Sequence, residues 1–538
     1  MKRILLSLAF VSTTAIAFSQ TYSWAIKDAA GGASTGYDMA TDASGNSYVT
    51  GYFGGTFTIG ATTLTAAGGD DIFTAKLDPA GALLWLVSGG GTGNDEGQSL
   101  VVDGSGNVFV LGYMNGTCNF GSTSLTSNGA EDIFLVKYDA TGAVVWAHNY
   151  GSAAMDFGND LAIDPTGNLY VVGSIGGNAT FGSIPVAPSG LEDALAFMTN
   201  GMGVALWGIS AGASSSDAYA DAVAIDGSGN LYMGGSFSGD IIFGSDTMHA
   251  NGMSDGFVAK LTSAPGWGWD VAISGTGNQE RVGGLACDAS NAPYITGTFD
   301  STVAFGVFNL TAGGFSDGFV GKMNAGSGAF TQVKQIGGPS SDMCGGVSLD
   351  GSNNVYVTGT FSSTATFGSG SPQTSAGGMD AFCAKYAPTS LTTTWVKTGG
   401  GPNDETGWGI AASTGGHCWF TGDFNGFANF GTSISLTGAS STRNAFVAKL
   451  SNPVGVKELS EISVLNIAPN PAADLIQINL PEGINNGTIH IYNSIGQLVM
   501  IQSLVNSSTI SIEEFSAGLY TIQLISEGKS FAGQLVKE

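Results

Sequence analysis

A segment of about 62 residues occurs seven times in succession, and this repetition constrains the fold more than any other feature of the sequence. One copy of its signature reads DGSGNVFVLG and begins at residue 103. The other six copies begin at residues 42, 164, 226, 288, 350 and 413. The steps between copies are 61, 61, 62, 62, 62 and 63 residues. Units of such constant length predict a repeat architecture in which every unit packs against its neighbours.

Each unit carries landmarks that indicate β-structure. The SGN or TGN segment predicts a hairpin turn, because Asn and Gly tolerate positive φ. The runs that follow it, such as YVTG and FVLG, are apolar at both alternating positions, which is typical of strands covered on both faces. An aromatic–Gly pair, a strand of the type DIFTAK and a Trp strand then recur with the same step. These landmarks predict an all-β fold, a seven-bladed β-propeller over residues 20–450, with four main strands and a short extra hairpin in each blade.

The order of the landmarks predicts how the ring closes. The chain opens with a Trp strand at Trp24, and the seventh unit ends near Leu450 without one. If the Trp strand is the outermost of each blade, residues 22–28 complete the last blade and remove its exposed edge. The recurrence of Trp at one landmark indicates packing between blades.

The two ends of the chain differ from the repeats. Lys2 and Arg3 precede an apolar stretch, and small residues follow at Ala17 and Ser19, which predicts a signal peptide over residues 1–19. No other run of about 18 apolar residues occurs, so we expect no transmembrane segment. Residues 451–463 are expected to form a linker. Short alternating strands over 464–538 predict a small C-terminal β-sandwich.

Composition excludes several classes of function. The net charge of −26 repels nucleic acid. Only four His are present, without zinc-ligand spacing, and no phosphate loop with Lys is found. We therefore predict no enzyme and no required cofactor. The five cysteines are odd in number and lack CxxC spacing, so they are not a disulfide framework, although one disulfide of unassigned pairing stays open.

An acidic residue recurs in the loop that precedes the inner strand in six of the seven units, and Ser34 takes its place in the first. The six residues are Asp95, Asp156, Asp217, Glu280, Asp342 and Asp404. A ring of carboxylates at one end of the channel would suit Ca²⁺ or a basic partner. Alternatively, each carboxylate orders its own loop by accepting backbone N–H bonds.

Two resemblances follow from these motifs. The D-x-S-G-N-x-Y-V-x-G hairpin followed by D-x-F-x-x-K resembles the SBBP family of bacterial β-propeller repeats, which implies an architecture rather than an activity. The tail resembles the type A C-terminal sorting domain of type IX secretion, which implies delivery to the outer surface of a Bacteroidota-type cell by that machinery. The residues that match the sorting motif are Pro469, Asn470, Pro471, Gly496, Gln497, Gly518 and Tyr520.

Together these features predict an exported or cell-surface propeller that acts as a binding or adhesion module for an extracellular polysaccharide or protein. The alternatives are a secreted polysaccharide lyase or hydrolase and a cation-stabilised scaffold. A cluster of non-repeated polar residues on the channel face of one blade would favour the enzyme. Trp408, expected in an inter-blade loop beside Asp404, is the candidate exposed aromatic residue.

Overall fold

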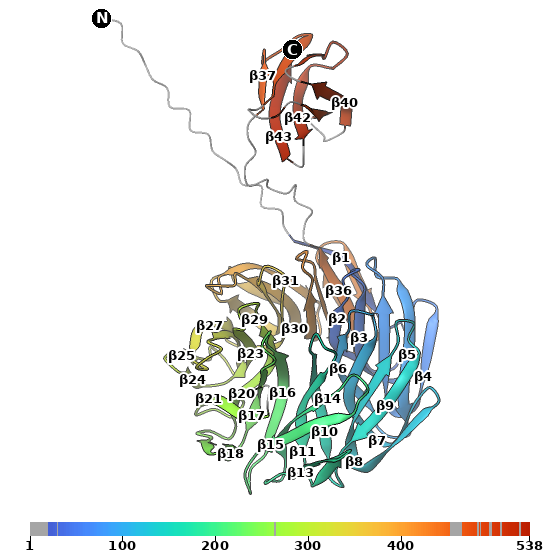
Figure 1. Ribbon diagram of the computed structural model, residues 1–538, viewed down its shortest axis with the longest axis vertical. Coiled ribbons are helices and arrows are strands. Elements are labelled where there is room, and N and C mark those ends of the chain that lie inside the picture. The colour runs from blue at the N-terminus through green and yellow to red at the C-terminus, as the bar shows by residue number, and fades with distance from the viewer. Residues whose placement is uncertain are drawn as a thin grey trace, which may run out of the picture. The chain divides into compact units, whose positions relative to one another are not determined.

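The computed structural model describes residues 20–29, 31–262, 265–451, 465–480, 484, 486–493, 498–505, 508–526 and 529–538. The predicted signal peptide and residues 452–463 of the predicted linker lie outside these ranges. The chain divides into two compact units, residues 1–453 and 454–538, which are described separately (Figure 1). No helix within the described ranges is long and apolar enough to cross a membrane.

In the first unit the described strands pair in groups of four antiparallel strands, which we call blades and number by their first strands. Blade 1 consists of β2 (Ser34–Thr41), β3 (Ser47–Ile59), β4 (Thr62–Leu77) and β5 (Leu83–Gly91). The described residues form six further groups, in the same order of pairing: β6 (Glu96–Val102), β7 (Val108–Phe120), β8 (Thr123–Tyr138) and β9 (Val144–Tyr150); β10 (Asp156–Ile163), β11 (Leu169–Ile175), β14 (Asp193–Thr199) and β15 (Ala205–Ala211); β16 (Ala218–Ile225), β17 (Leu231–Phe237), β20 (Asp255–Leu261) and β21 (Trp267–Gly275); β22 (Arg281–Cys287), β23 (Pro293–Phe299), β26 (Asp317–Met323) and β27 (Phe330–Gly337); β28 (Met343–Leu349), β29 (Val355–Phe367), β30 (Gln373–Tyr386) and β31 (Thr393–Gly400); β32 (Glu405–Ala412), β33 (Cys418–Phe424), β36 (Asn444–Ser451) and β1 (Thr21–Lys27).

The first strands of the blades form a closed circle. Each contacts the first strand of the next blade, and β32 of blade 7 contacts β2 of blade 1. These seven inner strands lie around the centre of the ring, and the other strands of each blade radiate outward (Figure 1). The predicted propeller fold is therefore confirmed.

The predicted closure by the N-terminal strand is also confirmed. β1 pairs antiparallel with β36, with Tyr22 opposite Leu450 and Lys27 opposite Phe446. Blade 7 thus takes three strands from the end of the repeat array and one from its beginning. Across the seam to blade 1, the Trp24 indole Nε1 donates to the Pro79 carbonyl at 3.1 Å. Trp85 makes the equivalent bond between blades 1 and 2, donating to the Ala140 carbonyl at 3.2 Å, which supports the predicted packing role of the Trp series.

The predicted extra hairpin is present in two forms. Blades 3, 4, 5 and 7 carry separate short hairpins: β12 (Ala179–Phe181) with β13 (Ile184–Val186), β18 (Asp240–Phe243) with β19 (Asp246–His249), β24 (Thr302–Phe305) with β25 (Phe308–Thr311), and β34 (Phe427–Phe430) with β35 (Ile434–Thr437). In blades 1, 2 and 6 the second and third strands simply extend to form it. In several blades it also pairs with the outer strand of the preceding blade, as where Phe120 lies opposite Gly89.

The recurring Asp of the hairpin signature organises its turn. In blade 6 the Asp350 carboxylate accepts N–H bonds from Ser352 at 2.9 Å and Asn354 at 3.0 Å, and the Tyr356 hydroxyl at 3.0 Å. The Lys385 ammonium of the D-x-F-x-x-K strand lies 4.8 Å from the centre of the Tyr356 ring. This cation–π contact explains why Lys ends that motif, a relation that the sequence alone does not reveal.

The C-terminal unit is a small β-sandwich of two sheets. One contains β37 (Asn466–Ala468), β38 (Leu475–Asn479) and β41 (Ser508–Ser511), and the other β40 (Leu498–Val505), β39 (Asn486–Tyr492), β42 (Gly518–Ser526) and β43 (Lys529–Lys537). Alternating Ile and Leu side chains from both sheets form its core. The alternating runs at 475–480, 488–493, 509–515 and 518–525 predict four of these strands, whereas β37, β40 and β43 are not predicted.

The sorting-motif residues within the described ranges take structural positions. The Asn470 side chain donates to the Gln534 carbonyl at 2.7 Å and accepts the Val536 N–H at 2.9 Å, so it joins the Pro469–Pro471 turn to β43. The Tyr520 hydroxyl donates to the Ser516 carbonyl at 2.8 Å. Gly496 and Gln497 lie outside the described residues.

Candidate functional site

A β-bulge interrupts the first strand of every blade near its start. A bulge leaves one or more residues outside the pairing register and turns their side chains away from the ladder. The bulged residues are, from blade 1 to blade 7, Tyr37, Gln98, Asn159, Asp221, Gly283, Gly345 with Gly346, and Trp408 with Gly409. The bulge is therefore a repeated element of the fold, whereas the side chains that it presents differ from blade to blade.

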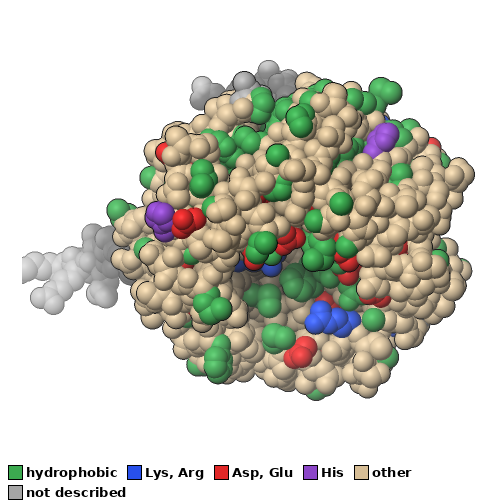
Figure 2. Space-filling view, turned by 90° about the horizontal axis from the view of Figure 1, so that it is seen from below, with side chains coloured by type: hydrophobic (Ala, Val, Ile, Leu, Met, Phe, Trp, Pro, Cys, Tyr) green, Lys and Arg blue, Asp and Glu red, His purple; other side chains and the backbone are tan. Residues whose placement is uncertain are grey.

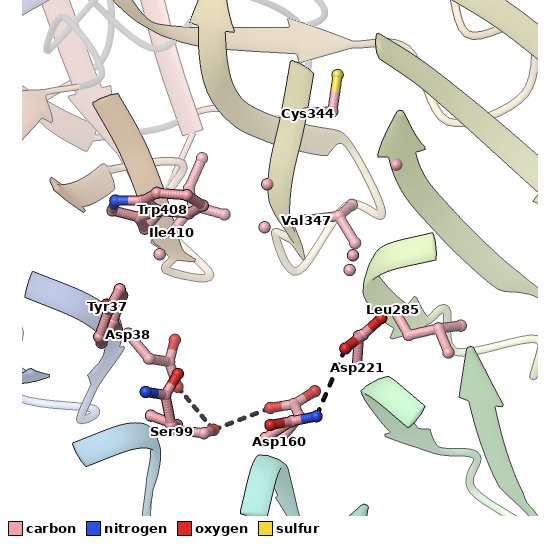
Figure 3. Close-up of a pocket in the computed structure, with 18 of the residues that line it drawn as sticks. Tyr37, Asp38, Ser99, Asp160, Asp221, Leu285, Cys344, Val347, Trp408 and Ile410 are labelled. Atoms are coloured by element: carbon pink, nitrogen blue, oxygen red, sulfur yellow. Dashed lines mark hydrogen bonds between the residues drawn. The ribbon is translucent and has the colours of Figure 1, made fainter. Parts of the chain in front are cut away.

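All these bulged residues line one cavity of about 450 Å³ in the central channel. Figure 2 shows the hollow at the centre of this face, with hydrophobic, acidic and basic side chains around it. Figure 3 shows residues that line this cavity from different inner strands, among them Tyr37, Ser99 and Trp408, whereas the labelled Cys344 side chain points away from it. A volume of this size can take a small ligand or the end of a longer one.

A Ser bridges two carboxylates on the polar wall of the cavity. The Ser99 Oγ lies 2.9 Å from Asp38 Oδ2 and 2.8 Å from Asp160 Oδ1 (Figure 3). Because a hydroxyl has a single hydrogen, it can donate to only one of these oxygens, and the other contact requires a proton on the carboxyl group. Burial, together with the nearby Asp38 charge, raises the pKa of Asp160 to about 7. Asp160 therefore carries the proton between the carboxyl group and Ser99 at a pH below neutral.

The same carboxylates tie inner strands of adjacent blades together. Asp38 of blade 1 accepts the Leu100 N–H of blade 2 at 2.9 Å. Asp160 of blade 3 accepts the Val223 N–H of blade 4 at 2.7 Å. These bonds satisfy backbone donors that no neighbouring strand pairs, so both side chains are held in fixed positions on the channel wall.

Asp221 and Arg281 extend the polar wall. The Arg281 Nε donates to Asp221 Oδ2 at 2.8 Å, while the Arg281 side chain stays 60% exposed. The Asn159 amide donates to the Ala220 carbonyl at 3.0 Å. Burial raises the pKa of Asp221, and the Arg281 charge opposes that shift. The wall therefore offers both carboxylate acceptors and a guanidinium donor.

The opposite wall is aromatic and aliphatic. The Tyr37 and Trp408 rings lie edge to face with centroids 6.0 Å apart, and the Trp408 Nε1 donates to Asp423 Oδ1 at 3.0 Å. Leu285 and Val347 continue this wall (Figure 3). Placing Trp408 in an inter-blade loop is wrong, because β32 already begins at Glu405 and the bulge turns the half-buried Trp408 into the channel.

The six predicted acidic residues do precede or begin the inner strands, but none of them lines the cavity. Asp95 accepts N–H bonds from Gly91 at 2.8 Å and Asn115 at 3.0 Å. Asp342 accepts the equivalent bonds from Gly338 at 2.8 Å and Ser362 at 2.9 Å. Asp156 accepts N–H bonds in the same way from residues 152 and 176. In these three blades the carboxylate orders its own loop.

The remaining members of the set depart from that pattern. Asp217 is only half-buried. Glu280 is buried, and its burial together with the nearby Asp300 charge raises its pKa to about 7. Asp404 is exposed, and the adjacent Glu405 is the buried residue that accepts the Gly401 N–H at 2.7 Å. Across the described residues, no group of three or more His, Cys, Asp or Glu side chains could hold a metal ion. Calcium binding by this set stays a prediction.

The sequence patterns also left a second buried acidic series unexplained. The Asp that opens each D-x-F strand is buried and accepts the N–H of a residue three or four positions earlier, as Asp71 does from Ala67 at 2.9 Å. The series comprises Asp71, Asp132, Asp193, Asp255, Asp317 and Asp380, with Asn444 in blade 7. Its strict repetition marks it as part of the fold.

A second non-repeated feature lies at the same end of the propeller. Two residues before this buried Asp, blades 3, 4 and 5 carry Leu191, Met253 and Phe315, which are 69%, 74% and 82% exposed. The same position is Gly69, Ala130, Gly378 and Thr442 in the other blades. The first and third strands of a blade run parallel, so these loops stand beside the starts of the inner strands. An apolar row thus adjoins the bulged end of the channel.

Comparison with known proteins agrees with this architecture. The "Secretion system C-terminal sorting domain" family matches residues 466–538, and the "Beta-propeller repeat" family matches residues 146–178 and 333–360. Both resemblances drawn from the motifs are confirmed. The chain is a secreted β-propeller protein, and its sorting domain points to type IX secretion and the cell surface.

Curated relatives match only part of the chain. "Regulatory protein FlaEY" of Caulobacter vibrioides is 31% identical over 280 residues, covering 48% of this chain and 29% of the relative. "Uncharacterized WD repeat-containing protein L264" of Acanthamoeba polyphaga mimivirus is 26% identical over 168 residues, covering 28% of this chain and 12% of the relative. The matches thus span less than a third of either relative.

Solved structures resemble the chain weakly. A europium-containing methanol dehydrogenase aligns with a TM-score of 0.36 and 10% identity, covering 76% of this chain and 78% of that one. A puromycin hydrolase aligns with a TM-score of 0.40 and 11% identity, covering 85% of this chain and 58% of that one. Similarity at this level carries no argument about activity.

Proposed function

We propose that this protein is a surface binding module whose propeller channel takes the end of an extracellular polysaccharide. The observation that carries the proposal is the contrast at the inner-strand bulge. All seven blades keep the bulge, yet the bulged residues include an aromatic phenol, two amides, a carboxylate, glycines and an indole. A position maintained only for folding would repeat its residue type, as the buried Asp of the D-x-F strand does.

The chemistry of the two walls favours a carbohydrate. The Trp408 and Tyr37 rings offer apolar surfaces with polar edges, against which the C–H face of a sugar ring can pack. Across the cavity, Asp221 and Arg281 offer acceptors and donors to hydroxyl groups, and charge-assisted bonds of this kind are strong. The lining thus combines polar groups that can orient a ligand with aromatic and aliphatic surface against which the ligand can pack.

The apolar row extends the site beyond the channel. Leu191, Met253 and Phe315 would contact a ligand that continues across the face after its end has entered the cavity. Exposed apolar side chains grouped on one face mark binding surfaces. This arrangement suits a chain-like ligand better than an isolated small molecule.

Trp408→Ala tests the proposal against a panel of polysaccharides and their oligosaccharides. We expect the parent protein to bind at least one member, and the variant to bind it at least tenfold more weakly, since truncating a buried aromatic anchor costs about 2 kcal/mol or more. Isothermal titration of the folded protein gives both affinities. Equal affinities for the parent and the variant would exclude the channel as the site.

The same panel separates the alternatives. A polysaccharide lyase or hydrolase, for which the proton on Asp160 is the supporting observation, would release reducing ends from the bound glycan. A cation-stabilised scaffold would bind no glycan, and its melting temperature would fall on addition of EDTA and recover with Ca²⁺. If the protein is a binding module, we expect no cleavage of the bound glycan and no loss of glycan affinity in EDTA.

A further inference from the structure

Two cysteines meet at the seam between blades 6 and 7. Cys383 lies on β30 of blade 6, and Cys418 is the first residue of β33 of blade 7. Their Sγ atoms are 3.3 Å apart, and both residues are fully buried. The side chains belong to one apolar cluster that includes Tyr356 and Phe420, so both blades hold the sulfurs in place.

We propose that Cys383 and Cys418 form a disulfide that joins blade 6 to the closing blade. The two sulfurs already lie within contact distance, so a small approach completes the bond. In the reaction each thiol loses its proton, the S–S bond forms, and two electrons pass by thiol–disulfide exchange to a disulfide oxidant, which becomes a dithiol. Export exposes the chain to compartments where such oxidants operate.

The burial of the pair dictates when the bond forms. Burial raises the pKa of Cys383 well above its ordinary value, and the thiolate is the attacking species in exchange. We infer that oxidation takes place while the seam between blades 6 and 7 is still open during folding. Once closed, the bond is shielded from external thiols.

The position of the bond gives it a structural role. Blade 7 is the only blade of the described ring that is built from both ends of the array, because β1 is its outer strand. The crosslink closes a loop of about 35 residues, and loop-closure entropy then predicts a higher midpoint of thermal unfolding by about 4 °C for a domain of this size. It therefore secures blade 7 to its neighbour.

Thiol counting on the full exported chain tests the proposal. The protein is collected without reductant from an oxidising compartment, denatured and alkylated, and its mass is measured. We expect three labels, on Cys118, Cys287 and Cys344, and five labels after prior reduction. Trypsin should also release residues 335–385 crosslinked to residues 398–443. Five labels without reduction would overturn the proposal.

Three variants distinguish this pair from other pairings. Cys383→Ser and Cys418→Ser should each give four labels without reduction, because the remaining partner becomes free. Cys344→Ser, which shares the tryptic fragment 335–385, should give two labels and keep the crosslinked peptide. A crosslink that is lost in Cys344→Ser and retained in Cys383→Ser would contradict the assignment. The parent and Cys344→Ser, which both keep the crosslink, should each lose about 4 °C of their midpoint once the crosslink has been reduced, whereas Cys383→Ser and Cys418→Ser should show no such loss.

Discussion

A chain that lacks residues 20–28 should melt about 10 °C below the parent and should associate through the edge of β36. Removing β1 abolishes a ladder of backbone hydrogen bonds, each contributing about 1 kcal/mol. It also removes the packing of Tyr22 against Phe430 and the contact of Trp24 across the seam to blade 1, at about 2 kcal/mol each. For a domain of this size, a total on the order of 8 kcal/mol corresponds to that shift in melting temperature.

Calorimetry and light scattering measure the two effects of this deletion. The unpaired donors and acceptors of β36 form a template for pairing with another chain, so dimers or larger species are expected. A synthetic peptide of residues 20–29 should restore the melting temperature and the monomer, whereas a peptide of the same composition in scrambled order should not. A deleted chain that melts like the parent and stays monomeric would contradict closure by β1.

Asp160→Asn should make the protein more stable at pH 8 by about 2 to 3 kcal/mol. The pKa of Asp160 is about 7 in the folded chain against an ordinary value of 3.8, so the native state holds its proton more tightly than the unfolded state. The free energy of unfolding therefore falls as the pH rises from about 4 to 7, and this group accounts for about 4 kcal/mol of that fall. Asn carries no charge, so its burial does not require a charged group to be desolvated. The substitution also removes the acceptor of the Leu161 N–H, which lowers the free energy of unfolding by roughly 1 kcal/mol.

Asp164→Asn is the matched control, because it lies four residues further on and has the opposite linkage. Hydrogen bonds from Thr166 and Asn168 outweigh partial burial and lower the pKa of Asp164, so its stabilisation is present above its ordinary pKa and is lost as the pH falls. Urea unfolding at pH 4.5 and pH 8 should show Asp160→Asn gaining at pH 8 and Asp164→Asn losing there. If the free energy of unfolding changed with pH in the same way in the parent and in Asp160→Asn, the assignment of a proton to Asp160 would be refuted. The pKa values of Glu280 and Glu405 are also raised. These two groups add the same pH dependence of stability to the parent and to both variants, so it cancels in the comparison.

Repetition made the architecture predictable from sequence. A signal that recurs at one step reports positions that the blades share, such as the turn Asp of DGSGN and the Trp of the outer strand, each of which is replaced in one blade, by Ser413 and Phe330. Even the closure by β1 follows from the order of landmarks, since Trp24 comes before the first unit. In the C-terminal unit, the strands that the patterns miss lack the same clean alternation; β40, for example, reads LVMIQSLV.

The candidate site could not be found in the same way, because its residues do not repeat. A bulge shifts the pairing register, and nothing in the local pattern marks where Tyr37 or Asn159 leaves the ladder. For the same reason the sequence pattern assigns Trp408 to a loop and selects Asp404 rather than the buried Glu405 beside it. The contact between Cys383 and Cys418 arises from packing between blades, which sequence spacing does not encode.

The most direct test of the central claim compares a bulged residue with a repeated one. The affinity of the best glycan of the panel is measured by isothermal titration for Trp408→Ala and for Trp85→Phe, which alters the repeated inter-blade Trp of blade 1. We expect Trp408→Ala to weaken binding at least tenfold, and Trp85→Phe to lower the melting temperature while leaving the affinity unchanged. Undiminished binding by Trp408→Ala, or an equal loss in both variants, would contradict the assignment of ligand binding to the channel.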